Sequence, residues 1–533
     1  MTSMIGTWQL ARLILRRERL RLAIWVVVLA LVPVNTAIAF VELYPTDAVR
    51  EQLVATAGSN PSIVSFLGPI YGSSVGALTA WRVGTIASVL VGLMASLTVI
   101  RNTREEEETG RRELLGSTVL GRYAPLTAAL LVAGGAGLAI GGLNAVGLVG
   151  AGLPARGAIV FGAGLAGIAL VYAAGAGVAA QLTEGAGAAR GIAIGFVGFG
   201  FLLRAGGDGG EASGLGWLSW LSPIGWSTRL RPFASERSSV ILAFLGVTVV
   251  MAGAAFALSS RRDVGAGVIA PRPGPASGAR WLRSPLALGW RIHRGSLVGW
   301  TVGLLVGGLV YGSLGQSIGD LLGDNPQLAE IFQQLGGAAG IVDAYFATVM
   351  GILALVTTAF AIRTVLRLRA EEESLRADVV LATAVKREQW VRSHLLFAVF
   401  GPLVMLAAAG TVAGLTHGAL VGDIAGQAPR VIGEALIQIP AVWVVLGVAV
   451  ALFGLAPRLT SVSWGVIVAS LLLGQLGQIL QFPQWALNLS PFSHVPRLTS
   501  ADFESSALVV LTAIALILTA IGIRGFRRRD VMA

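Results

Sequence analysis

Twelve apolar stretches, most of them close to twenty residues long, alternate with short polar segments along the chain. A helix that rises 1.5 Å per residue needs about 20 apolar residues to cross the hydrocarbon core of a bilayer. The pattern therefore predicts membrane-spanning helices at 22–42, 83–100, 123–152, 157–181, 191–204, 238–258, 296–316, 344–362, 394–416, 436–456, 461–480 and 506–523. The fifth stretch is short and rich in glycine, which leaves open whether it is a full span or a broken, re-entrant one.

Composition narrows the fold class. Of the 533 residues, 55% are hydrophobic, 13% are charged and none is cysteine. Soluble domains carry about 25% charged residues, so a soluble enzyme, a disordered chain and an outer-membrane barrel are poor interpretations. The lack of cysteine excludes a disulfide scaffold, a thiolate metal site and a cysteine nucleophile. We expect an all-α polytopic membrane protein.

The net charge of +11 describes topology rather than nucleic-acid binding. Twelve spans put both termini on one side, and the segments on that side hold 30 of the 39 Lys and Arg residues but only 14 of the 28 Asp and Glu residues. Lys and Arg in short loops mark the cytoplasmic side of a membrane protein. Both termini are therefore predicted to be cytoplasmic.

The arginines before the first span allow two interpretations. Together with the apolar run and the small residues at 37–39, they resemble a signal peptide with its cleavage site. A retained span is favoured because Trp25 near its start is matched by Trp300 in the seventh span. Residues 8–21 then form an amphipathic helix on the surface of the inner leaflet.

Two segments repeat each other at a separation of 265 positions. Residues 106–122 and 371–387 share three glutamates, two arginines and a threonine at this shift, which also aligns two Asn-Pro pairs. A Leu-Ser-Pro sequence precedes the last span of each half, and Arg-Arg-Asp-Val follows it. The chain is therefore predicted to contain two parallel copies of a six-span unit, 1–260 and 283–533, joined by a Pro-, Gly- and Arg-rich cytoplasmic linker at 261–282.

Each copy carries a short, strongly charged segment between its second and third spans. Oppositely charged residues four positions apart stabilise an exposed helix, and Thr103 with Glu106 fits a capping box. The pairs are Glu107–Arg111, Glu108–Arg112 and Glu372–Arg376. One such segment would be an ordinary solvated face. Two matched copies in a protein with few other charges indicate a docking surface for a cytoplasmic partner.

The predicted spans contain almost no acidic residues, whereas an ion-coupled transporter needs titratable groups inside the membrane. The chain also has no GxxxxGK[ST] loop for nucleotide phosphates. A separate ATPase is the favoured energy source. A 6+6 secondary drug transporter is the main alternative. A membrane-embedded lipid-processing enzyme is less favoured, because the four histidines are scattered without metal-ligand spacing.

The glutamate-rich segments and Leu-Ser-Pro turns resemble the permease subunits of type-2 ABC exporters. In layout the chain resembles duplicated actinobacterial exporters of polyketide antibiotics of the tetronasin type and their mycobacterial multidrug-efflux relatives. The resemblance implies two tandem six-helix ABC-2-type bundles in a bacterial plasma (inner) membrane, with elbow helices at 8–21 and 283–294. It also implies coupling helices at 103–115 and 369–380 that seat on two copies of a cytoplasmic ABC ATPase, which bind ATP and Mg²⁺. The residues implied to dock the ATPase are Arg104, Glu106, Glu107, Glu108, Arg111, Glu113, Arg369, Glu371, Glu372, Glu373, Arg376 and Asp378.

No catalytic residue, cofactor, metal site or nucleic-acid partner is expected in this chain, and its partners are ATPases, membrane lipids and cargo. An interior with few charges suits amphipathic or hydrophobic compounds, such as antibiotics, drugs or lipids. Candidate cargo-pathway residues are Trp81, Phe199, Phe201, Tyr345 and Phe346. Outer segments 205–236 and 481–505 are predicted to form re-entrant lids. Small residues such as Gly162, Gly303 and Gly308 are predicted to allow close helix contact.

Overall fold

The protein is described here by a computed structural model. It describes residues 2–59, 61–112, 119–211, 214–269, 276–323, 337–473, 483–496, 498 and 505–530. These residues form helices joined by turns, and 11 of the helices are long and apolar enough to cross a membrane. The predicted all-α polytopic class is confirmed.

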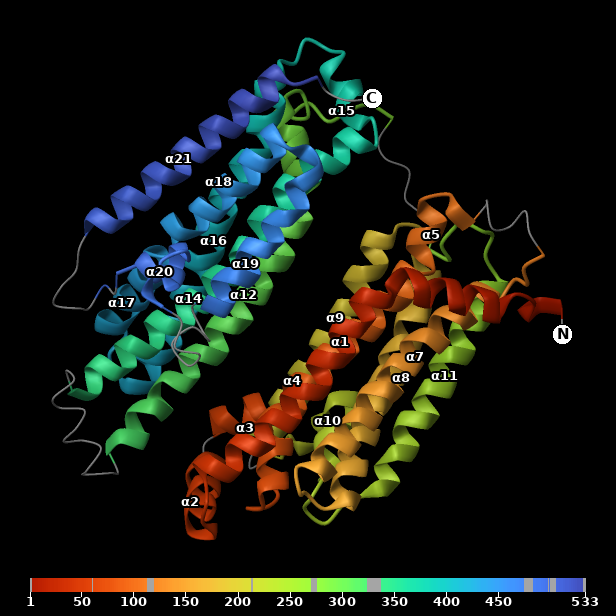
Figure 1. Cartoon of the computed structure of the whole chain (residues 1–533), viewed down its shortest axis with the longest axis vertical. Helices are drawn as coiled ribbons and strands as arrows, with labels where there is room; N and C mark the ends of the chain where they lie inside the picture. Colours follow the sequence, from red (N-terminus) through yellow and green to blue (C-terminus); the bar gives the residue numbers. More distant parts are fainter. Residues whose placement is uncertain are drawn as a thin grey trace. The chain divides into compact units, whose positions relative to one another are not determined.

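The chain folds as two compact units, Met1–Gly274 and Pro275–Ala533. The helices of the first unit are α1 (Thr7–Leu43), α2 (Asp47–Gly58), α3 (Pro61–Leu67), α4 (Val75–Arg101), α5 (Arg104–Glu108), α7 (Ala124–Gly150), α8 (Ala155–Leu182), α9 (Ala186–Gly209), α10 (Pro223–Arg229) and α11 (Ile241–Ser260). In Figure 1 its long helices run side by side, with α5 at one end and α2 at the other.

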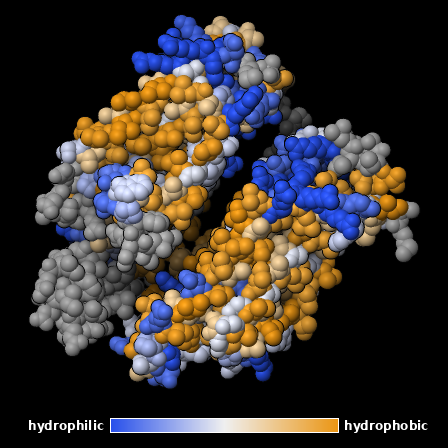
Figure 2. Space-filling view, viewed as in Figure 1, coloured by the Kyte–Doolittle hydropathy of each residue, from blue (hydrophilic) through white to orange (hydrophobic). Residues whose placement is uncertain are grey.

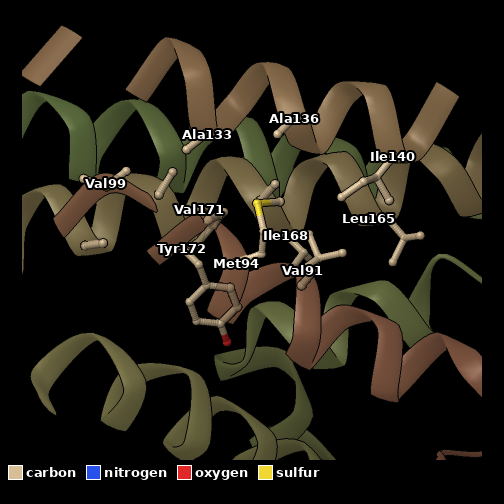
Figure 3. Packing of buried hydrophobic residues seen from close by; sticks show 14 of the residues in the cluster. Val91, Met94, Val99, Ala133, Ala136, Ile140, Leu165, Ile168, Val171 and Tyr172 are labelled. Atoms are coloured by element: carbon tan, nitrogen blue, oxygen red, sulfur yellow. The ribbon is translucent and has the colours of Figure 1, made fainter. Parts of the chain in front are cut away.

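The core of the first unit is built around α8, the most buried of its long helices. Small and branched side chains of α4, α7 and α8 interlock there, with the Tyr172 ring among them (Figure 3). Tyr172 also packs edge-to-face on Phe196, with ring centroids 5.0 Å apart. Alanine and glycine leave room for this close contact, since van der Waals packing drives helix association in lipid.

The second unit has its own helices and core clusters. Its helices are α12 (Pro285–Gly323), α14 (Gly337–Glu373), α15 (Arg376–Leu381), α16 (Arg387–Val421), α17 (Ile424–Leu436), α18 (Ile439–Leu455), α19 (Ser463–Leu471), α20 (Gln484–Leu487) and α21 (Ser505–Arg528). Within this unit α12 packs on α16, and α18 packs on α21. Residues 474–480 of the predicted eleventh span lie outside the described residues, so α19 represents only its first part.

The structure shifts several predicted boundaries. No break separates the expected elbow at 8–21 from the first span, because both lie in one 37-residue helix, α1, and α12 likewise joins the second elbow to its span; the role of these segments as elbows stays a prediction. The fifth span is neither short nor broken, because α9 is a continuous helix of 24 residues. Of the expected lid at 205–236, the first part extends α9, and a 3₁₀ helix (Gly216–Leu221) and α10 follow. The other expected lid, 481–505, lies partly outside the described residues.

The Leu-Ser-Pro turn before α11 has a clear structural role. The Ser222 hydroxyl accepts hydrogen bonds from the amides of Ile224 (3.1 Å) and Gly225 (3.2 Å), which caps α10. The same hydroxyl donates to the carbonyl of Gly200 in α9 at 2.6 Å. One side chain therefore starts α10 and holds it against α9.

Close helix contact is confirmed at some of the predicted glycines. A Cβ on Gly308 of α12 would lie 2.4 Å from the Ala409 carbonyl oxygen of α16, and a Cβ on Gly162 would lie 2.2 Å from the Gly141 carbonyl oxygen. A Cβ on Gly303, by contrast, would meet open space.

Gly308→Ala is expected to lower the free energy of unfolding by about 1–3 kcal/mol, because the added methyl group forces α12 away from the α16 backbone. Thermal unfolding of the detergent-purified chain measures this change. Gly303→Ala is the matched control on the same helix and is expected to leave the midpoint unchanged or to raise it. Equal effects of the two variants would contradict the close packing.

Charge is concentrated at one end of each unit. Figure 2 shows hydrophilic residues gathered around α5 in the first unit and around α15 in the second, with hydrophobic surface along the sides of both. We call these regions the charged ends of the two units. They contain the glutamate-rich segments on which the sequence prediction of docking rests.

Candidate functional site

The first charged segment is organised around one buried carboxylate. The Glu107 side chain is 1% exposed and contacts three arginines: Arg104 of its own short helix at 2.6 Å, Arg262 at 2.8 Å, and Arg112. Arg262 follows the last helix of the unit, α11, and donates to both carboxylate oxygens. Glu107 thereby links the segment after α4 to the segment after α11. We call such a buried glutamate with its arginine partners a tie.

Arg104 adds a second set of bonds to the same tie. Its guanidinium donates to the carbonyl oxygens of Glu184 (2.6 Å), Gly265 (2.8 Å) and Ala266 (3.0 Å), and its side chain is fully buried. These carbonyls belong to the turn between α8 and α9 and to the segment after α11. A single arginine therefore holds three segments together at the charged end.

Burial and, for Arg112, the crowding of positive charge lower the pKa of two arginines in this cluster. Burial, followed by the positive charges of Arg262, Arg104 and Arg122, lowers the pKa of Arg112 to about 10. Burial alone lowers the pKa of Arg262 below its usual value. The charged end of the first unit therefore holds its arginines at an electrostatic cost, which an added anion would reduce.

The second unit repeats the tie. The Glu372 side chain is also 1% exposed, and it accepts hydrogen bonds from Arg369 at 3.3 Å and Arg529 at 2.6 Å. Arg369 precedes Glu372 by three residues, as Arg104 precedes Glu107. Arg529 follows the last helix, α21, as Arg262 follows α11. Two arginines around one buried carboxylate are thus common to both units.

A third arginine fastens the start of the following helix in each unit. Arg122, just before α7, donates to the carbonyl oxygens of Ser259 (2.8 Å) and Arg262 (2.9 Å). Arg387, at the start of α16, donates to the carbonyl oxygen of Arg529 at 2.9 Å. In both units, therefore, the glutamate-rich segment, the start of the next long helix and the end of the last helix are bonded to one another.

The predicted pairs four residues apart are wrong. Arg111 contacts Glu106 at 3.2 Å and Arg112 contacts Glu107, while a Glu108 oxygen accepts from the Ala186 amide at 2.8 Å. In the second unit Arg376 lies 3.8 Å from Glu371. The capping box is also wrong, since the Thr103 hydroxyl donates to the Val99 carbonyl oxygen instead. Because α5 ends at Glu108 and α14 ends at Glu373, these arginines lie beyond the helix that carries their glutamates, and the four-residue spacing of a helix does not apply to them.

The expectation of a fully exposed charged helix is wrong for the residues at its centre. Among the residues predicted to dock an ATPase, the structure buries Arg104, Glu106, Glu107, Glu371 and Glu372, leaves Arg369 half-buried, and exposes Glu108, Arg111, Glu373, Arg376 and Asp378. Glu113 lies outside the described residues. Their role in docking stays a prediction, and only the exposed subset offers charge to a partner.

The aromatic residues proposed for cargo lie in different surroundings, and their role also stays a prediction. Trp81 donates its indole N–H to the Gly68 carbonyl oxygen at 2.9 Å, and the Phe201 ring lies under the Arg204 guanidinium. Tyr345 and Phe346 contact each other edge-to-face, and Phe346 is 2% exposed. Phe199 is 60% exposed.

A buried ionic cluster near the opposite end of the first unit was not predicted from the sequence. Asp208 on α9 accepts from the Ser219 hydroxyl at 2.5 Å and lies 3.6 Å from Arg204 and 3.7 Å from Arg229. The side chains of Arg204 and Asp208 are both fully buried. Their spacing of four residues was the only local signal, and it was lost because the fifth span was predicted to end at residue 204.

A histidine pair was also missed. The ring nitrogens of His293 on α12 and His394 on α16 lie 2.8 Å apart, and both rings are buried. The interpretation of the histidines as scattered is therefore wrong for these two. Among the residues that the structure describes, no three or more His, Asp or Glu side chains are grouped to hold a metal ion.

Comparison with known proteins gives a family model for the second half of the chain and a relative that matches nearly its whole length. A family model described as "Multidrug efflux system permease Rv1217c, C-terminal domain" matches residues 282–527. The chain is 44% identical over 527 residues to the "Multidrug efflux system permease protein Rv1217c" of Mycobacterium tuberculosis (strain ATCC 25618 / H37Rv). This match covers 99% of the chain and 95% of the relative.

Proposed function

This chain belongs to the family of the mycobacterial multidrug efflux permease Rv1217c, and from that premise we propose that it is the membrane-spanning subunit of an ATP-driven exporter. Family membership and the 11 apolar helices make it a multi-pass membrane permease for drug efflux. The proposal adds the energy source, the partners and the orientation. Separate ATPase subunits, one for each charged end, would bind ATP and Mg²⁺ on the cytoplasmic side of the bacterial inner membrane.

The observation that carries the proposal is the tie found in both units. A partner that pushes on the exposed tip of a glutamate-rich segment acts on a helix end that is rigidly bonded to its surroundings. The exposed residues of the tips are Glu108, Thr109 and Arg111 in the first unit and 373–376, Asp378 and Val379 in the second. Buried ion pairs at the base and charged side chains at the tip suit a docking element that must transmit force.

The same bonds supply a route for coupling. Displacement of the first segment passes through Glu107 and Arg262 to the end of α11, and displacement of the second passes through Glu372 and Arg529 to the end of α21. In each unit the last helix is therefore tied to the docking segment. ATP binding by the partners would shift both segments, and these ties would carry the shift into the membrane-spanning helices of both units.

The presence of the same tie in both units also supports an internal duplication. The pairs Arg104–Glu107 and Arg369–Glu372 have the same spacing, and the second arginine comes from the repeated Arg-Arg-Asp-Val sequence in each case. One chain would then supply both docking segments of the exporter, with one ATPase copy on each. Amphipathic or hydrophobic drugs and antibiotics are the cargo that fits a membrane interior with few charges.

The proposal is tested with the double variant Arg111→Glu and Arg376→Glu, which reverses one exposed charge on each tip. Retention of a co-expressed ABC ATPase subunit is expected to fall at least about tenfold in co-purification, because reversed charges cost several kcal/mol at an interface. ATP-dependent drug efflux in reconstituted vesicles should fall with it.

The matched control is Arg19→Glu with Arg280→Glu, which makes the same charge change at exposed positions outside the tips. This control should retain the ATPase. Unchanged retention in the Arg111 and Arg376 double variant would overturn docking at the tips. If drug efflux continues without any ATPase and stops when a protonophore is added, the whole proposal is overturned, and the chain is a secondary transporter.

A further inference from the structure

A large cavity lies at the charged end of the first unit. Its volume is about 690 Å³, and it is bounded by the first turns of α1, the end of α4, the start of α7 and the segment after α11. The residues that line it are Leu10, Leu13, Ile14, Arg17, Asn102, Thr103, Glu106, Arg112, Leu120, Gly121, Arg122, Pro125, Ser259, Arg262, Asp263 and Val264. The exposed tip residues Glu108, Thr109 and Arg111 are not among these lining residues.

One wall of the cavity is apolar and continuous with the side of α1. Leu13 and Arg17, which line the cavity, occupy the same helical stripe as Leu20, Ile24, Val28 and Leu31, at spacings of three and four residues. These four side chains are between 49% and 71% exposed. A chain of methylene groups that leaves the cavity would therefore find a continuous apolar track along a membrane-spanning helix.

The other wall is positively charged. Four arginines line the cavity, whereas Glu106 and Asp263 are the acidic side chains in its wall. Glu106 is already engaged by Arg17 at 2.8 Å and Arg111 at 3.2 Å. The Arg262 side chain is 5% exposed and that of Arg112 is 18% exposed, so both positive charges are largely withdrawn from water. Together with Arg104 they share a single carboxylate, that of Glu107, so positive charge remains in excess here and an anion placed against Arg112 would offset it.

We propose that this cavity binds one anionic phospholipid, with its phosphate against Arg17, Arg112 and Arg122 and its acyl chains along the exposed stripe of α1. Basic pockets between membrane helices are suited to acidic lipid head groups, since planar guanidinium groups pair with phosphate oxygens. The apolar track distinguishes a lipid from a free phosphate, which would need no such surface. The bound lipid would fasten the start of α1 to the tied segments beside it.

The site is tested by purifying the full chain in mild detergent and exchanging it into nanodiscs with equal amounts of phosphatidylglycerol and phosphatidylcholine. Native mass spectrometry then counts the lipid that stays bound after release. About one phosphatidylglycerol per chain is expected. Arg17→Gln should reduce its retention about fivefold through the lost charge contact. Leu13→Trp, which narrows the apolar side of the cavity without changing its charge, should reduce retention to a similar extent.

Two controls lie on the same helix but do not line the cavity. Arg16→Gln removes the same charge from an exposed position, and Leu15→Trp adds the same bulk at an exposed leucine. Both should retain the lipid. Equal retention of phosphatidylcholine and phosphatidylglycerol, or an equal loss in the Arg16→Gln control, would overturn the proposal. The proposal would also be overturned if exported drugs displaced the bound lipid but added phosphatidylglycerol did not. That result would identify the cavity as a cargo site.

Discussion

Glu107→Gln is expected to lower the free energy of unfolding by about 3–5 kcal/mol, the usual cost of removing one partner from a buried ion pair. The carboxylate is 1% exposed and faces Arg104, Arg262 and Arg112. Glutamine keeps the shape but leaves three guanidinium groups without an opposing charge. Thermal unfolding of the detergent-purified chain measures the loss, and its midpoint should fall by roughly 6–20 °C.

The neighbouring Glu108 supplies the control. Its side chain accepts one hydrogen bond, from the Ala186 amide, and the residue is exposed. Glu108→Gln should cost no more than about 1.5 kcal/mol. The double variant Glu107→Gln with Arg262→Gln removes the excess positive charge and should recover part of the lost stability. Equal midpoints for Glu107→Gln and Glu108→Gln would show that the buried carboxylate does not hold this end of the unit together.

A variant of the second tie can measure its effect on folding separately from its effect on the coupling of ATP hydrolysis to drug export. If Glu372 and Arg529 link the second docking segment to α21, a charge exchange between them should restore stability while altering the geometry of the link. Stability and ATPase association would then be near normal, and the ratio of drug exported to ATP hydrolysed would fall. This follows because Arg262 and Arg529, just after the last helices, bond the glutamate-rich segments, whereas in the proposed mechanism the exposed tips only attach the ATPase.

Hydropathy predicted the membrane-spanning helices well because each must carry its own apolar surface. It misjudged their ends where polar residues continue a helix inside the protein. The fifth span was cut at Arg204, yet α9 continues to Gly209 because Arg204 and Asp208 neutralise each other in the interior. The first span was predicted to begin at residue 22, after the arginines, yet α1 begins at Thr7. The helix continues through its arginines outside the apolar segment, where Arg17 pairs with Glu106.

The repeat predicted where the charged segments lie but not what they contact. Spacing of four residues is a local signal, whereas the partner of Glu107 lies 155 positions away at Arg262. The repeated Arg-Arg-Asp-Val sequence contained that partner in both halves, but nothing in a linear pattern says that two repeated segments meet. His293 and His394, 101 positions apart, show the same limit, because their pairing depends on the packing of α12 against α16.

Asp208→Asn is the second substitution expected to have a large effect, at about 3–5 kcal/mol of unfolding free energy. Arg204 is fully buried, Arg229 is 9% exposed, and both face this carboxylate. Arg204 also donates to the Phe66 carbonyl oxygen at 2.8 Å, so its guanidinium cannot swing out to water without breaking the contact between α9 and α3. Thermal unfolding should show a midpoint lowered by roughly 6–20 °C.

Glu211→Gln is the matched control, because its side chain is 58% exposed and lies 3.8 Å from the same Arg229. An exposed pair of this kind is worth about 1 kcal/mol at most. Arg204→Met added to Asp208→Asn replaces the buried ion pair by a neutral pair and should restore much of the stability, since such replacements are often neutral. If that double variant folds but no longer exports drugs, the cluster serves transport as well as folding. If Asp208→Asn and Glu211→Gln have the same midpoint of thermal unfolding, the cluster does not stabilise this end of the first unit.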